Sequence, residues 1–141
     1  MQSTVSKTVN APIDRVWAII ADHEGMAKWA PGLSAAILKD GADTRNGVGA
    51  VRELKGPLSV PTIVEEIVGF EPQRRLAYRA LSGVPLKNYT GEIVLTPQGT
   101  ERTTITYTVA ADQRVPLVEK AVTLAIATSL LGAVVLQAAK K

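Results

Sequence analysis

A long uncharged tail behind a run of short strands is the feature that most constrains the fold of this chain. Segments rich in apolar and β-branched residues alternate with turn residues between positions 34 and 111. Because short turns join neighbouring segments, the pattern predicts an antiparallel sheet. The predicted strands cover residues 34–39, 48–55, 60–70, 75–82, 87–96 and 102–111.

The last of these strands indicates how the sheet is buried. Apolar residues occupy every second position from Ile105 to Val109, and threonines occupy positions 104, 106 and 108. This alternation is typical of a strand with one buried face and one face in water.

The first thirty residues predict a strand followed by two helices. Residues 3–9 are rich in β-branched types, and Pro12 suits the first turn of a helix. Apolar residues then recur at 13, 16, 17 and 20, which places them on one helical face. A short second helix is expected from Glu24 to Trp29, ended by Pro31-Gly32.

From about Pro116 the tail predicts one long helix. Nineteen residues without charge, Ala121 to Ala139, approach the length of about twenty that spans a bilayer. Polar and small residues interrupt this run, and the sheet needs a helix to cover it, so we expect the tail to pack on the sheet. Thr123 and Gln137 share one helical face with Glu119; the opposite face carries Thr128, Ser129 and Gly132. That second face would line a cavity, pair with a second copy in a homodimer, or contact a membrane peripherally.

Composition excludes several classes of site. A chain of 141 residues with 46% apolar content is expected to form one domain, residues 1–141. With no Cys and a single His, no metal site is expected, and no glycine-rich phosphate loop or other cofactor motif is present. The net charge of +3 is scattered, so no nucleic-acid partner is expected. The N-terminus lacks an apolar signal core, which favours a cytoplasmic location.

Three parts of the chain resemble the START-like (SRPBCC) superfamily, or helix-grip fold. The residues that carry the likeness are Ala11-Pro12, Val16-Trp17, Asp22 and Trp29, then Gly49 to Arg52, then Glu65-Glu66, Glu71-Pro72, Arg75 to Tyr78 and Tyr89. The second and third groups are similar to its polyketide cyclase/dehydrase-like branch. The resemblance implies an α+β fold in which a curved antiparallel sheet wraps around the C-terminal helix, with two short helices after the first strand. It also implies a cavity between sheet and helix. The chain departs from the family at Tyr107, where members often carry Trp, and in its more continuously apolar closing helix.

Two charged residues on predicted strands are the main candidates for a site. If Arg52 and Glu65 point inward, they would pair with each other or hold a polar group of a ligand, because a buried charge without a partner is very costly. If they point outward, they would form a weak cross-strand pair in water. Both orientations remain open, and Glu66 faces the other way in either case.

Four aromatic residues complete the candidate ligand-binding set. Tyr78, Tyr89 and Tyr107 lie on predicted strands, where each could bind a ligand oxygen or simply pack in the core. Trp29 is placed at the cavity mouth. His23, the single histidine, is expected to be a solvated loop residue.

Three functions follow as hypotheses. The first is a module that binds a hydrophobic small molecule, such as a lipid, an aromatic compound or a polyketide-like compound. The second is an aromatase/cyclase-type enzyme, with Glu65 as base and Arg52 or a tyrosine as oxyanion donor. The third is an interaction or membrane-associated protein that uses the apolar tail helix.

Overall fold

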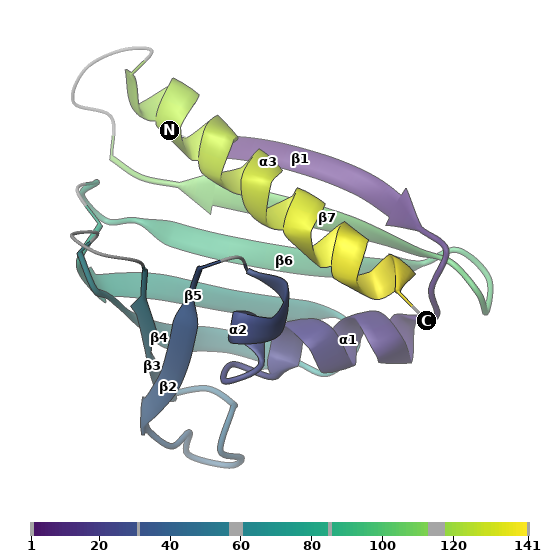
Figure 1. Ribbon diagram of the computed structural model, residues 1–141, viewed down its shortest axis with the longest axis horizontal. Helices are drawn as coiled ribbons and strands as arrows, with labels where there is room; N and C mark the ends of the chain where they lie inside the picture. The colour runs from purple at the N-terminus through teal and green to yellow at the C-terminus, as the bar shows by residue number, and fades with distance from the viewer. Residues whose placement is uncertain (1, 31, 57–60, 85, 113–117, 141) are drawn as a thin grey trace.

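The computed structural model describes residues 2–30, 32–56, 61–84, 86–112 and 118–140. Seven strands form one antiparallel sheet in the order β1-β7-β6-β5-β4-β3-β2 (Figure 1). The strands are β1 (Gln2–Val9), β2 (Ser34–Lys39), β3 (Val51–Lys55), β4 (Ile63–Glu71), β5 (Arg75–Ser82), β6 (Thr90–Pro97) and β7 (Thr103–Ala110). The helices are α1 (Ile13–Ala21), α2 (Met26–Trp29) and α3 (Val118–Ala139). This is the predicted fold class, and each predicted element is found within a few residues of its expected bounds.

The sheet curves around one side of α3, which packs against β1 and β7 and touches α1 and α2 (Figure 1). Register shifts between Val64 and Glu65, and between Ile67 and Gly69, interrupt the β4–β5 pairing. Such irregularities increase local bending of a strand pair.

The predicted alternation in β7 is confirmed. Ile105 and Val109 are fully buried, while hydroxyl pairs join β1 and β7 on the outer face. These pairs link Thr4 to Thr108, Ser6 to Thr106 and Thr8 to Thr104. Water therefore contacts one face of this sheet, and the core lies on the other.

The first helix begins as its sequence predicts. The carbonyl of Pro12 accepts hydrogen bonds from the backbone N–H groups of Arg15 and Val16. Val16 and Ile20 are buried, and Asp14 lies in the first turn, where its charge favours the helix dipole.

The buried side of α3 consists mostly of small residues and also includes Leu131. Thr123, Ala127, Val134 and Ala138 are fully buried, which lets the helix approach β1 closely. The Oγ atoms of Thr123 and Ser3 lie 2.7 Å apart in a buried hydrogen bond. The predicted packing of the tail on the sheet is thus confirmed, whereas its expected start near Pro116 lies outside the described residues.

Candidate functional site

A cavity of about 550 Å³ lies between the sheet and α3. Most of its wall is apolar, and one end carries charged and hydroxyl groups. The described lining residues are Met26, Leu33, Arg52, Leu54, Pro61, Ile63, Glu65, Tyr78, Gly83, Val84, Tyr89, Tyr107, Ala125, Ile126, Ser129 and Leu130.

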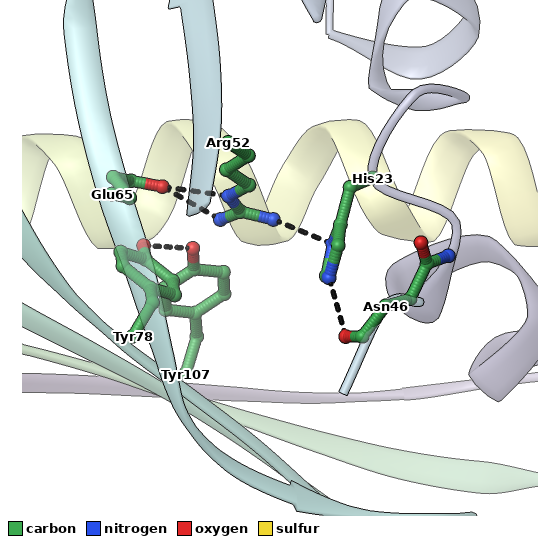
Figure 2. A network of polar contacts seen from close by, with 6 residues as sticks. All are labelled: His23, Asn46, Arg52, Glu65, Tyr78 and Tyr107. Carbon is green, nitrogen blue, oxygen red and sulfur yellow. Dashed lines mark hydrogen bonds and ion pairs between the residues drawn. The ribbon is translucent and has the colours of Figure 1, made fainter. Parts of the chain in front are cut away.

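Arg52 and Glu65 form a buried ion pair at the polar end. They lie opposite each other on the neighbouring strands β3 and β4. The Oε1 atom of Glu65 accepts from Nε of Arg52 at 2.9 Å and lies 2.8 Å from Nη2 (Figure 2). Both side chains are about 4% exposed. The structure therefore decides for the inward orientation that the sequence left open.

The alternation of β4 explains why its two adjacent glutamates differ. Glu65 shares the inward face with the buried Ile67, and Glu66 points away from the cavity. Glu66 instead pairs with Arg79, whose Nη2 lies 2.6 Å from Oε1 on the outer face. Sequence alone did not show which of the two faces inward, because shifting the strand by one residue exchanges them.

His23 is fully buried, so the expectation of a solvated loop residue is wrong. Its Nδ1 lies 3.2 Å from Nη1 of Arg52, and its Nε2 lies 2.8 Å from the carbonyl oxygen of Asn46 (Figure 2). A guanidinium only donates, so Nδ1 accepts and the Nε2–H donates to Asn46. Burial, helped by the Arg52 charge, lowers the pKa of His23 to about 4. The imidazole is therefore neutral near pH 7 and acts as an acceptor that fixes Arg52.

Asn46 holds the loop between β2 and β3 over His23. Its Nδ2 donates to the carbonyl of Ala21, the last residue of α1, at 2.8 Å. In the sequence, Asn46-Gly47 indicates only a turn, and nothing local shows that the turn closes over a histidine 23 positions earlier. This contact, rather than residue type, buries His23.

Three tyrosines complete the polar end of the cavity. The guanidinium of Arg52 lies 4.8 Å from the centroid of the Tyr78 ring, and the hydroxyl of Tyr78 lies 2.5 Å from that of Tyr107. Burial raises the pKa of Tyr89 to about 12 and raises the pKa values of Tyr78 and Tyr107 as well. All three hydroxyls therefore keep their protons at neutral pH. One proton joins Tyr78 and Tyr107, which leaves a second proton of this pair for another acceptor.

Gly91 makes room for this arrangement, a role that the sequence analysis missed. It lies opposite Tyr78 in the β5–β6 pairing. A Cβ at position 91 would lie 2.2 Å from Cζ of Tyr78 and 2.3 Å from its hydroxyl oxygen, which is closer than real Cβ contacts. A glycine inside a strand is the sequence signal for such a close approach.

Trp29, which the sequence analysis expected at the cavity mouth, is not among the described residues that line the cavity. Trp29 lines two outer grooves that it shares with Lys28, Gln137 and Lys140. Its Nε1 is buried and has no hydrogen-bond partner among the described residues.

Several apolar side chains of α3 are exposed to water. Leu136 is 70% exposed, and Leu124 and Val122 are also exposed. Within Lys120–Ala139, a window of 18 residues has a mean hydropathy of 2.0, and 28% of that window is buried. By length and composition alone this helix would suffice to cross a membrane, a test that core helices of soluble proteins also pass.

Comparison with known proteins gives the family. Residues 1–139 match the family model described as polyketide cyclase / dehydrase and lipid transport. The chain belongs to this family. Membership supports a role in hydrophobic small-molecule binding or in cyclisation, and it confirms the resemblance seen in the sequence. A search among curated proteins gave no match.

Solved structures of other proteins share the fold. A START superfamily protein from Mycobacterium smegmatis is 16% identical, with a TM-score of 0.80 over 97% of this chain and 96% of that one. The ZhuI aromatase/cyclase from Streptomyces sp. R1128 is 24% identical, with a TM-score of 0.75 over 98% and 93%. A point mutant of norcoclaurine synthase from Thalictrum flavum, solved with a transition-state analogue, is 16% identical, with a TM-score of 0.74 over 98% and 93%. At these identities the likeness establishes the helix-grip fold.

Proposed function

We propose that this protein binds a hydrophobic small molecule in the cavity between the sheet and α3. One observation carries the proposal: a cavity of about 550 Å³ has mostly apolar walls and a cluster of polar groups around Arg52. Pockets for small organic molecules commonly measure about 300–1,000 Å³ and pair apolar walls with a few placed polar groups. Burial of apolar surface would supply most of the affinity.

The polar end would orient the ligand. Three guanidinium nitrogens of Arg52 already contact Glu65 and His23, so this side chain is held rigidly. The Tyr78–Tyr107 hydroxyl pair has one proton to donate, and Tyr89 adds a third hydroxyl to the cavity wall. A ligand carbonyl, hydroxyl or phenol group would find partners here, with its hydrocarbon part against Leu54, Ile126 and their neighbours.

Native mass spectrometry of the purified protein, followed by solvent extraction of bound material, tests this proposal. We expect a co-purified apolar molecule. Ala125→Trp adds an indole ring at the cavity wall and should reduce this bound mass, because Ala125 lines the cavity. Ala121→Trp adds the same ring to an exposed position of the helix that is not part of the cavity lining and should leave it unchanged. If both variants carried the same amount of the co-purified molecule, the proposed binding site would be wrong.

A cyclase activity is the alternative use of the same cavity. An aldol cyclisation needs a base that accepts a substrate proton. Both close contacts from Arg52 converge on Oε1 of Glu65, so Oε2 is the oxygen that would accept a substrate proton. Loss of turnover of a polyketide-like substrate in Glu65→Gln, with ligand binding intact, would favour the enzyme. Unchanged turnover would exclude this mechanism.

The groove beside the C-terminal part of α3 supports a second proposal, that the protein docks on anionic lipid surfaces. Leu136 projects from the helix, and Lys28 and Lys140 line the same groove. Apolar side chains beside cations match a bilayer with anionic headgroups. Two copies joined through this groove would bring like charges together, which disfavours a homodimer.

Co-sedimentation with lipid vesicles tests this docking. We expect binding to phosphatidylcholine vesicles that contain phosphatidylglycerol, and weaker binding for Leu136→Gln and for Lys28→Gln combined with Lys140→Gln. Lys55→Gln, an exposed charge on β3 that does not line this groove, is the matched control. Absence of vesicle binding would overturn the proposal, as would a concentration-dependent dimer that Leu136→Gln dissociates in lipid-free buffer.

A further inference from the structure

We propose that the cavity selects uncharged ligands over carboxylate ligands of the same shape. This inference rests on the proposed binding function and names the class of ligand. It follows from the charge balance at the polar end of the cavity, where the one cation already has its counterion.

Arg52 and Glu65 are the only charged side chains among the described residues that line the cavity. They are 4% and 3% exposed as residues, and their two closest N···O distances are 2.8 and 2.9 Å. The formal charge of the pair is zero, and little water reaches it. A ligand therefore meets a neutral dipole instead of a free guanidinium.

The groups around this pair add no charge. His23 accepts a hydrogen bond from Arg52, which requires a neutral Nδ1, and burial keeps its pKa near 4. Tyr78 covers the guanidinium with its ring, and its hydroxyl bonds to that of Tyr107. Burial raises the pKa values of both tyrosines, so neither becomes an anion near pH 7.

A carboxylate that entered this end would lose its water and gain no cation. It would lie close to the Glu65 carboxylate, and the guanidinium that it could reach already carries Glu65 as its counterion. Burying an ion without a partner is costly, and expelling one carboxylate to admit another gains nothing. An amide or a carbonyl carries no such cost and can accept the available tyrosine proton. The ion pair thus acts as a charge filter.

Matched probes that differ only in charge test this inference by isothermal titration calorimetry. Naphthamide and naphthoate form an aromatic pair, and dodecanamide and dodecanoate form an aliphatic pair. At pH 7 we expect the wild-type protein to bind at least one amide at least about tenfold more tightly than its carboxylate. This comparison needs no variant, so it does not depend on whether a variant folds.

Replacing Glu65, the anion of the pair, should shift the ligand preference towards carboxylates. Glu65→Gln leaves Arg52 without a counterion, so the carboxylate probe should now bind more tightly than it binds wild type, by about tenfold or more. Glu66→Gln removes a charge from the adjacent position on the outer face and should keep the wild-type order. Arg52→Met together with Glu65→Leu removes both charges and should also keep the preference for the amide.

The outcomes separate the inference from the function on which it rests. If neither amide nor carboxylate of either pair binds, and nothing apolar co-purifies, the proposed function fails and the filter fails with it. If the probes bind but the carboxylates equal or exceed the amides in wild type, the binding function stands and the charge filter is wrong. A preference for amides that Glu65→Gln leaves untouched would also refute the role of the ion pair.

Discussion

Replacing both members of the buried ion pair should destabilise the protein less than replacing either one. Arg52→Met leaves the Glu65 carboxylate buried without a cation, and Glu65→Leu leaves the guanidinium without an anion. Charge centres about 4 Å apart attract by about 4 kcal/mol at an effective dielectric constant of about 20. Removing one partner of a buried pair typically costs about 3–5 kcal/mol, so we expect each single variant to lose that much.

The double variant should lose only about 1–3 kcal/mol. Met and Leu can fill the space with apolar contacts, and replacing a whole buried pair is often nearly neutral. The remaining loss comes from His23, whose Nδ1 then has no donor from Arg52. The result that identifies a buried ion pair is the order of the three stability losses, in which the double variant loses less than either single variant.

Urea unfolding followed by circular dichroism measures this order. With a slope of about 2 kcal/mol per M, each single variant should lower the midpoint by about 1.5–2.5 M. Glu66→Gln breaks the partly exposed pair with Arg79 and should cost less than about 1 kcal/mol. A double variant that costs as much as the two singles together would show that the two charges do not interact, and the reasoning would be refuted.

Three further predictions concern single positions. Gly91→Ala should cost about 1–3 kcal/mol and weaken ligand binding, because its Cβ would overlap the Tyr78 ring; a normal midpoint in urea would show that the ring moves freely. Gly132→Ala should raise stability by about 0.5–1 kcal/mol, since a Cβ in α3 meets nothing within 4 Å and alanine favours the helix; a loss of stability would mean that the helix is packed there. Folding lowers the pKa of His23 from 6.5 to about 4, so between these pH values the unfolded chain binds more protons than the folded protein. The free energy of unfolding should therefore be highest above pH 6.5 and should fall as the pH is lowered towards 4. The expected loss of unfolding free energy is on the order of 3 kcal/mol. Urea unfolding at several pH values should show that the stability of His23→Gln depends less on pH than that of wild type.

The candidate site was only partly predictable from the sequence. Arg52 and Glu65 stood out because charges on apolar strands need a reason, and the structure brings them together. Tyr78, Tyr89 and Tyr107 were candidates by residue type, and all three line the cavity. Their roles as ligand contacts remain predictions.

The sequence missed contacts made by distant segments. His23 lies in a polar stretch, and its burial depends on a loop that closes over it through Asn46. Trp29 was expected at the cavity mouth, but α2 places it in the outer grooves beside α3. Neither placement has a signal in nearby residues, because both result from how separate elements pack.

Local periodicity determined the elements of this protein, and packing decided the site. A period of two in the strands, turn residues between them and a helical tail were enough to predict an antiparallel sheet covered by a helix, since these patterns depend on near neighbours. The helix-grip arrangement of these elements came from the family resemblance. The direction of Arg52 and Glu65 depended on the register of β3 against β4, which alternation alone leaves open by one residue. The neutral state of His23 depended on burial by a loop from elsewhere in the chain. Only the tertiary structure decides such features, because the burial and pairing of a side chain depend on residues that are distant in the sequence.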